Sequence, residues 1–348
     1  MWLRSLVSTL MNFEYNSVYI VAEIGVNHNG SLLEAKKLVD AAKDSGVNAV
    51  KFQVFSTDKL LVKTAEKAAY QKKTDGFENQ YKMLSSLELN QEEFTQLFEY
   101  CNGVGIDYFS SAFDVDSIDF LNKLGQKIWK IPSGEINNLP LLLKISAIAK
   151  TVIISTGMAN LDEIKVCLEI FKNNEVILLH CTSNYPTNAV NVNIRTIALF
   201  KEEFSNIKVG FSDHTEGITA AQLAVAMGAV FIEKHFTLNN EAPGPDHQAS
   251  LNPSQMKDYV EGIRLAEIML GVKDKIISLE EMDTKLLVRK SIYASTKINK
   301  GDEFSSKNLI TLRPALGINP MQWNKLLGRI SSRTYQKGQI IEFDEIGS

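Results

Sequence analysis

Eight short apolar runs alternate with helix-like stretches through most of the chain, and this alternation constrains the fold more than any other feature. Such runs are typical of parallel strands that are buried on both faces and joined by helices. No dinucleotide-binding fingerprint follows the first run, so a (β/α)8 TIM barrel is favoured over a doubly wound sheet. The runs are Val18–Ile24, Ala49–Phe55, Asp107–Phe113, Ile128–Ile131, Val152–Ser155, Val176–His180, Lys208–Phe211 and Val230–Lys234.

The helical pattern between the runs carries recognisable ends. Ser31 and Gly46 flank the first helix as an N-cap and a C-terminal glycine. A long polar insertion, Leu60–Asn90, follows the second run and is placed to act as a lid. The clearest expected helices are Leu32–Ser45, Val115–Leu124, Leu161–Phe171 and Ile218–Met227.

The pattern changes after Gly271, which indicates a second domain. We expect an N-terminal extension over residues 1–14, the barrel over 15–271, a linker with some helix over 272–288 and a small domain over 289–348. The small domain has short segments at Ser291–Thr296, Leu309–Arg313 and Gly338–Phe343, so we expect it to be rich in β or irregular structure. An α/β barrel followed by a small β-rich domain is the predicted architecture.

Composition excludes several classes of protein. The formal net charge of −4 gives no reason to expect nucleic-acid binding. No apolar run has the length of a membrane span. Three cysteines, Cys101, Cys167 and Cys181, are too few for a disulfide framework in 348 residues, which predicts reduced thiols and a cytoplasmic location.

Two histidines, His214 and His235, stand just beyond neighbouring apolar runs. Parallel strands bring such residues to one edge of the sheet, where two imidazoles can bind a divalent metal. The segment around Asp246 and His247 adds a carboxylate and a third imidazole to the same rim. The alternative is a pair of core histidines bonded to backbone carbonyls.

Lysines in apolar strands are costly to bury unless they are paired. Lys51 and Lys130 occupy such positions. With nearby serines they predict a cationic, hydroxyl-rich pocket suited to a phosphate; the serines are Ser111, Ser133, Ser155 and Ser212. One alternative is that each lysine pairs with a strand carboxylate such as Glu23 or Glu233, and another is a Schiff base on one lysine.

Glu135 follows the fourth run and could act as a general base on water, or could instead be a structural partner of one of the lysines. Tyr185 and Asp246 offer polar contacts of the kind a sugar uses, although both could be solvated loop residues. We count Glu23, Lys51, Lys130 and Glu135 as the catalytic candidates.

Motifs along nearly the whole chain resemble those of the bacterial sialic acid synthases, which condense phosphoenolpyruvate with N-acetylmannosamine. The matching segments are Ala22–Gly30, Val50–Gln53, Lys130–Glu135, Ile154–Met158, His180–Thr182, Gly210–His214, Glu233–Thr237, Gly244–His247 and Arg289–Ser291. The resemblance implies a TIM barrel followed by a small antifreeze-like (SAF) domain.

The resemblance also implies roles for individual residues. It places a manganese-type ion on His214 and His235; ligand chemistry alone would also permit zinc or iron, and magnesium or cobalt are further candidates. The implied phosphoenolpyruvate contacts are Lys51, Ser111, Lys130, Ser133, Ser155, Ser183 and Ser212. The implied sugar contacts are Gln53, Tyr185, Asp246 and Arg313.

In that family the small domain of one chain covers the barrel mouth of its partner, so the resemblance implies a swapped homodimer. The expected activity is N-acetylneuraminate synthesis from phosphoenolpyruvate and N-acetylmannosamine. The alternative within the class is a legionaminic or pseudaminic acid synthase, which uses a 6-deoxy-2,4-diacetamido sugar. Retention of both lysines, both histidines and Glu135 argues against a non-catalytic ice- or carbohydrate-binding protein.

Overall fold

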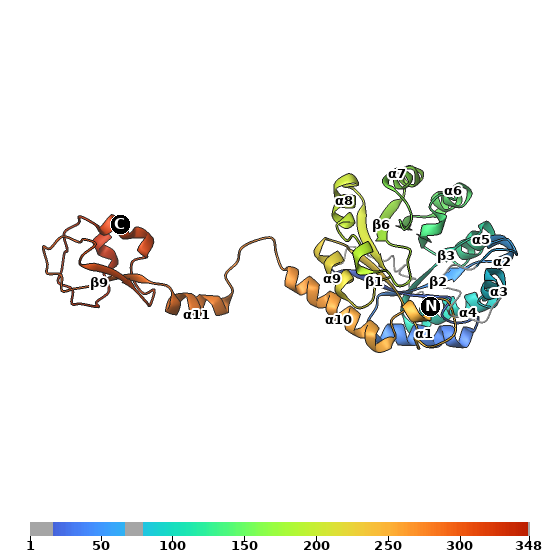
Figure 1. Ribbon diagram of the computed structural model, residues 1–348, viewed down its shortest axis with the longest axis horizontal. Helices are drawn as coiled ribbons and strands as arrows, with labels where there is room; N and C mark the ends of the chain where they lie inside the picture. Colours follow the sequence, from blue (N-terminus) through green and yellow to red (C-terminus); the bar gives the residue numbers. More distant parts are fainter. Residues whose placement is uncertain (1–16, 67–78, 347–348) are drawn as a thin grey trace, which may run out of the picture. The chain divides into compact units, whose positions relative to one another are not determined.

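The computed structural model describes residues 17–66 and 79–346, and eight parallel strands within them close into a barrel (Figure 1). All eight predicted strands are confirmed, with ends that differ by at most two residues. They are β1 (Tyr19–Gly25), β2 (Ala49–Val54), β3 (Asp107–Ala112), β4 (Ile128–Ile131), β5 (Thr151–Ser155), β6 (Glu175–Cys181), β7 (Lys208–Asp213) and β8 (Phe231–His235).

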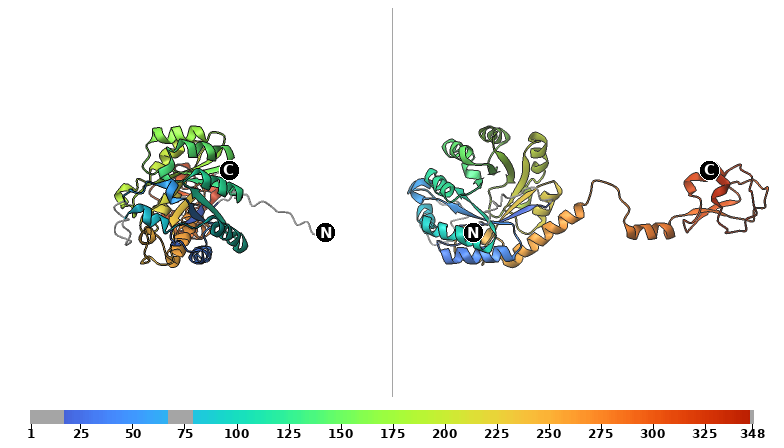
Figure 2. Two further views of the ribbon diagram at one scale, coloured as in Figure 1. Left: turned by 90° about the vertical axis from the view of Figure 1, so that its right-hand side faces the viewer. Right: turned by 180° about the vertical axis from the view of Figure 1, so that it is seen from behind.

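Helices surround the barrel, as Figures 1 and 2 show from opposite sides. The first helix begins after the predicted cap, where the Ser31 hydroxyl accepts from the Glu34 amide, and it ends before Gly46 at φ +83°. The helices of this unit are α1 (Leu32–Asp44), α2 (Thr57–Leu60), α3 (Gln80–Ser85), α4 (Gln91–Val104), α5 (Val115–Lys123), α6 (Leu139–Ile148), α7 (Leu161–Ile170), α8 (Thr196–Glu203), α9 (Thr219–Ala226) and α10 (Pro253–Leu270).

The barrel interior is built in layers because successive side chains of a strand point to opposite faces. An apolar layer fills the amino-terminal part of the barrel and includes Phe109, Leu179 and Phe231. Gly210 lies in this layer, where an added Cβ would come 2.5 Å from the Phe231 carbonyl oxygen. The next inward positions along the strands are polar or charged, so the packed layer forms the floor of a polar mouth.

A second compact unit runs from Val272 to the end of the chain. It contains α11 (Leu279–Val288), a two-stranded antiparallel sheet of β9 (Ser291–Ala294) and β10 (Leu309–Leu312), and α12 (Trp323–Leu326). The predicted segment Gly338–Phe343 contributes an isolated bridge between Ile340 and Tyr293 rather than a strand. The second unit has a small apolar core that includes Phe304 and Tyr335. Apart from β9 and β10, the described residues of this unit form short helices and irregular structure.

Two predictions concern segments outside the described residues. The N-terminal extension 1–14 lies outside them, and so do residues 67–78 of the predicted lid 60–90. Among the residues that the structure describes, no helix has both the length and the apolar character needed to cross a bilayer.

Candidate active site

Four charged side chains form a layer immediately above the apolar floor of the barrel. Glu23, Lys51 and Glu233 occupy inward positions of β1, β2 and β8, and Lys130 lies on β4. Each is at most 5% exposed. The strand register aligns Glu23 with Lys51 on one side and with His235 on the other, so closure of the barrel brings residues from both ends of the sequence together.

Both lysines of this layer are paired with carboxylates, as the ion-pair alternative proposed. Lys51 Nζ lies 2.6 Å from Glu23 Oε2 and 3.8 Å from Glu233 Oε2, while Lys130 Nζ lies 3.6 Å from Glu233 Oε1. Although burial opposes ionisation of Glu233, both lysines hold its pKa below the ordinary value. Glu233 therefore remains an anion between two cations.

The other members of this layer titrate differently. Burial, together with the charge of Glu233, raises the pKa of Glu23 despite the neighbouring Lys51. Although burial opposes it, Glu23 and Glu233 raise the pKa of Lys51. Burial lowers the pKa of Lys130, with Lys51 adding to the effect. Glu23 is thus the carboxyl group of this layer best suited to carry a proton.

A cluster of serine hydroxyls surrounds Gly157 after β5. The Ser133 hydroxyl accepts from the Gly157 amide at 3.0 Å, and the Ser155 hydroxyl accepts from Lys130 at 2.7 Å. A Cβ added to Gly157 would come 2.2 Å from Ser183 Oγ and 2.8 Å from Ser133 Oγ. Gly157 therefore leaves space for the Ser133 and Ser183 hydroxyls, and the nearby strand residues Ser155 and Lys130 supply a third hydroxyl and a cation. Hydroxyls and a cation are the donors that a phosphate requires.

The two remaining predicted serines lie in neighbouring strands. The Ser212 hydroxyl donates to Glu233 Oε1 at 3.1 Å. Ser111 is aligned with Lys130 across β3 and β4, is fully buried, and its hydroxyl has no hydrogen-bond partner. A buried unpartnered hydroxyl is unusual in a folded protein. Its position beside Lys130 is consistent with a ligand that supplies the missing partner.

His214 and His235 converge above the charged layer, as predicted. Their ring centroids are 5.3 Å apart, and Tyr185 packs against both rings at 4.2 and 5.6 Å. His235 Nδ1 is buried without a hydrogen-bond partner and lies 3.9 Å from Asp246 Oδ2. Burial raises the pKa of Asp246 to about 6, and nearby Glu23 contributes.

These side chains fit a metal that the protein holds through two imidazoles. His214 Nδ1 is hydrogen-bonded to the Thr182 carbonyl at 2.8 Å, which leaves its other nitrogen for a ligand. Within residues 17–66 and 79–346, no set of three or more His, Cys, Asp or Glu residues forms a metal-binding group. Such a metal would therefore take its remaining ligands from substrate or water, as divalent cations of the magnesium type commonly do.

The other three histidines have structural partners. His180 Nε2 bonds the Val192 carbonyl at 2.6 Å, and the ring packs against Phe211. His247 bonds the Thr237 hydroxyl at 2.7 Å, and His28 Nδ1 accepts from the Gly30 amide at 3.1 Å. The core-histidine alternative, a ring bonded to a backbone carbonyl, describes His180 and also one nitrogen of His214, whereas it does not describe His235. His28 Nε2, like His235 Nδ1, is buried without a hydrogen-bond partner.

The remaining predicted residues are placed separately. Gln53 donates to Glu23 at 2.9 Å, which puts it beside the charged layer. Glu135 is half-buried and accepts from Asn138 at 2.6 Å; among the described residues it pairs with neither Lys51 nor Lys130. Arg313 is an exposed residue of the C-terminal unit.

Three residues of the mouth were missing from the predicted site. Glu233 links both lysines, Gly157 makes room for the hydroxyls, and Cys181 Sγ lies 3.6 Å from Ser133 Oγ and 3.8 Å from His214 Nδ1. Strand alternation could have identified two of them, since Glu233 stands two positions before His235 and Cys181 two positions after Leu179 of the barrel floor.

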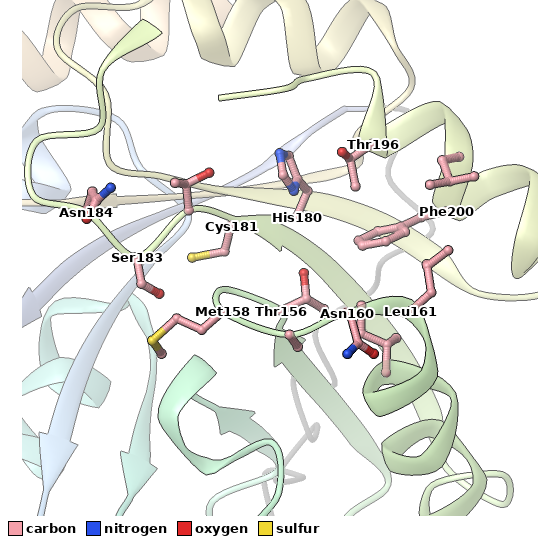
Figure 3. Close-up of a pocket in the computed structure, with 14 residues that line it drawn as sticks. Thr156, Met158, Asn160, Leu161, His180, Cys181, Ser183, Asn184, Thr196 and Phe200 are labelled. Atoms are coloured by element: carbon pink, nitrogen blue, oxygen red, sulfur yellow. The ribbon is translucent and has the colours of Figure 1, made fainter. Parts of the chain in front are cut away.

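A pocket of about 510 Å³ adjoins the serine cluster between the β5 and β6 loops. Figure 3 shows Cys181 and Ser183 on the side of this pocket that borders the barrel mouth, with Leu161 and Phe200 on the opposite side. The serine cluster is therefore bordered by a hollow at the carboxyl end of the strands, where TIM barrels carry their active sites.

Comparisons with known proteins agree with this arrangement. The chain matches the NeuB family over residues 38–275 and the SAF domain over residues 289–346. It is 45% identical over 336 residues to N,N'-diacetyllegionaminic acid synthase of Legionella pneumophila, covering 94% of each chain. It is 37% identical to pseudaminic acid synthase of Campylobacter jejuni, covering 93% of this chain and 95% of that protein. The chain also superposes on a solved structure of N-acetylneuraminic acid (sialic acid) synthetase from Leptospira borgpetersenii in complex with citrate. The TM-score is 0.69 at 32% identity, and the match covers 77% of this chain and 90% of that chain.

Proposed function

Because the chain belongs to the NeuB family and ends in a SAF domain, we propose that it condenses phosphoenolpyruvate with a 6-deoxy-2,4-diacetamido sugar to form a legionaminic-type acid and phosphate. The family and the barrel with its SAF domain, both predicted from the sequence, are confirmed. The observation that carries the proposed chemistry is the order of the side chains along the barrel axis. Lys51, Lys130 and the serine hydroxyls lie next to the apolar floor, and the convergent histidine pair lies beyond them toward the opening.

The phosphoenolpyruvate end of the site would be the lower layer. Lys130 and the hydroxyls of Ser133, Ser155 and Ser183 around Gly157 match the donor requirements of a phosphate. Lys51 would neutralise the carboxylate of the same substrate, with Ser111 and Ser212 nearby. A proton on Glu23, whose pKa burial and Glu233 raise, would lessen the negative charge that an anionic substrate meets.

The sugar would occupy the upper layer, where Gln53, Tyr185 and Asp246 offer polar contacts. His214 and His235 would hold a divalent cation, for which manganese is our first candidate and magnesium or cobalt are others. When bound, such a cation supplies Lewis-acid polarisation of a carbonyl oxygen. The unpartnered Nδ1 of His235 supports this assignment.

In the proposed reaction the methylene carbon of phosphoenolpyruvate forms a bond to the aldehyde carbon of the open-chain sugar, whose oxygen takes up a proton. Positive charge develops at the carbon that bears the phosphate ester. A water adds there and gives one proton to Glu135, which releases it to solvent and so balances the proton that the sugar oxygen takes up. Phosphate then leaves with the electrons of its carbon–oxygen bond and takes the proton of the new hydroxyl as the carbonyl of the product forms. Lys51 and Lys130 would stabilise the anionic groups throughout.

The choice of sugar is supported by the comparisons rather than by the mouth itself. The sequence favoured N-acetylmannosamine, but the relative named as a legionaminic acid synthase shares 45% identity, against 32% for the solved sialic acid synthetase. The alternative stated from the sequence is therefore the better supported one. The cytoplasmic location and the swapped homodimer, in which Arg313 of one chain would contact the sugar in its partner, stay predictions.

Phosphate release tests this proposal directly. The purified protein would be mixed with phosphoenolpyruvate, Mn²⁺ and either the 2,4-diacetamido-6-deoxy sugar or N-acetylmannosamine, with a chelator as control. We expect rapid release with the diacetamido sugar, slower release with N-acetylmannosamine and none after chelation. Faster release with N-acetylmannosamine would reverse the sugar assignment, and full activity after chelation would contradict the metal's role.

A further inference from the structure

Three buried residues lie directly behind the histidine pair. Asp213 precedes His214 on β7, and Lys234 precedes His235 on β8. Because neighbouring side chains of a strand face opposite ways, Asp213 and Lys234 point outward from the barrel when the histidines point inward. There they meet Tyr259 of α10, and all three side chains are at most 1% exposed.

The Asp213 carboxylate has a partner on every side. Its Oδ1 accepts from the amide of Thr215 at 2.8 Å and from the Thr215 hydroxyl at 2.7 Å. Its Oδ2 accepts from the Tyr259 hydroxyl at 2.8 Å and lies 3.3 Å from Lys234 Nζ. Lys234 also donates to the Thr215 carbonyl and lies 5.7 Å from the centre of the Tyr259 ring. The residues on both sides of His214 are therefore held by one network.

Stability is a weak explanation for a charged network at this depth. The cost of removing two charges from water commonly offsets their attraction, and apolar residues of similar volume are often as stable. The surrounding layer is apolar, with Phe211, Ile232 and Phe236 in the same core. What the network adds is geometry, since Asp213 and Lys234 are register partners and join β7 to β8 at the base of the histidine pair.

We propose that Asp213, Lys234 and Tyr259 are positioning residues that fix the separation and orientation of His214 and His235 for a divalent cation. This inference rests on the metal centre of the proposed function. Groups behind metal ligands set ring orientation, and their loss typically weakens metal affinity about 10–100-fold. The ring of His214 is oriented directly by the Thr182 carbonyl. The network acts on the pair through the backbone, because Asp213 and Lys234 are the chain neighbours of the two histidines and join β7 to β8.

The test measures Mn²⁺ binding to the metal-free, full-length protein from the electron paramagnetic resonance signal of free Mn²⁺. The double variant Asp213→Leu/Lys234→Met replaces the pair by apolar side chains, and Tyr259→Phe removes one hydrogen bond while keeping the packing. Arg264→Met is the matched control. Arg264 is on the same helix as Tyr259, but it bonds Val18 and Asn48, which precede β1 and β2 at the end of the barrel away from the histidines.

We expect the double variant to unfold near the wild-type temperature and to bind Mn²⁺ about 10–100-fold more weakly. Tyr259→Phe should weaken binding less, and Arg264→Met should not change it. Wild-type affinity in a folded double variant would overturn the inference, and so would an equal loss in Arg264→Met. If the double variant does not fold, unchanged affinity in Tyr259→Phe overturns it. Failure of the wild type to bind Mn²⁺ would instead remove the proposed metal centre itself.

Discussion

Lys130 occupies a buried position between Glu233 and the Ser155 hydroxyl, where a bound phosphate would replace or share partners it already has. Lys130→Met should raise the KM for phosphoenolpyruvate about tenfold or more and change the KM for the sugar less, because it removes a charge-assisted contact. Lys144→Met, which removes an exposed ion pair with Asp119, is the control.

Borohydride trapping in the wild-type protein tests the Schiff-base alternative for Lys130. Burial lowers the pKa of Lys130, which would favour a neutral, nucleophilic amine. Borohydride added during turnover should leave Lys130 unmodified, as judged by peptide mass. A reduced adduct with a carbonyl substrate on Lys130 would exclude the phosphate role and support covalent catalysis.

Gly157 offers a second probe of the phosphate position. Its missing Cβ leaves space where the Ser183 and Ser133 hydroxyls approach. Gly157→Ala should therefore weaken phosphoenolpyruvate binding, because the added Cβ displaces both hydroxyls. Gly134→Ala, where an added Cβ meets nothing within 4 Å, is the matched control. Equal KM values in Gly157→Ala and wild type would place the phosphate elsewhere.

At the scale of elements, the β1–α1 connection is held to the end of the barrel by buried polar side chains. Asn27 donates to the Phe236 carbonyl and to Ser250, and the neighbouring His28 accepts from the Gly30 amide. Burial lowers the pKa of His28 to about 4, with His247 adding to the effect. The connection therefore requires a neutral imidazole.

This requirement predicts acid sensitivity. The unfolded chain binds a proton at His28 below about pH 6.5, whereas the folded chain does so only near pH 4. The contribution of His28 to the free energy of unfolding is therefore fully present above pH 6.5. It falls as the pH drops from 6.5 toward 4, by up to about 1.4 kcal/mol per pH unit, because only the unfolded chain binds the proton in that range. Urea unfolding of His28→Gln should show a smaller loss between pH 7 and pH 5 than the wild type. An identical pH slope in both proteins would contradict the assignment.

The strands could be predicted from the sequence because burial on both faces makes them continuous apolar runs. The histidine pair followed from the parallel arrangement. The sequence offered the lysine–carboxylate pairs of the charged layer only as an alternative, and the alignment of Glu23 with His235 could not be read from it, because that alignment arises only when β1 closes against β8. Ending the seventh run at Phe211 instead of Asp213 also hid the alternation that places Ser212 beside Glu233.

At the scale of the molecule, the chain has two compact units, and the swapped homodimer is a prediction that complementation can test. Arg313→Ala and Glu135→Ala chains should each be inactive alone. A mixture that forms heterodimers should recover part of the activity, because one barrel then has its own Glu135 and the partner's Arg313. Recovery is measured as phosphate release after co-expression with two different affinity tags. Verified heterodimers without activity would show that Arg313 does not serve a partner's barrel.

We expect the barrel mouth to direct water to the carbon of phosphoenolpyruvate that bears the phosphate ester, and not to the phosphorus. Phosphoenolpyruvate with ¹⁸O at the bridging ester oxygen, mixed with the diacetamido sugar and Mn²⁺, tests this most directly. If water adds to carbon with help from Glu135, the carbon–oxygen bond breaks and the label leaves with phosphate, which ³¹P NMR detects. If the phosphate instead carries no label and the sugar acid keeps it, the oxygen–phosphorus bond has been cleaved. That result would contradict attack at carbon.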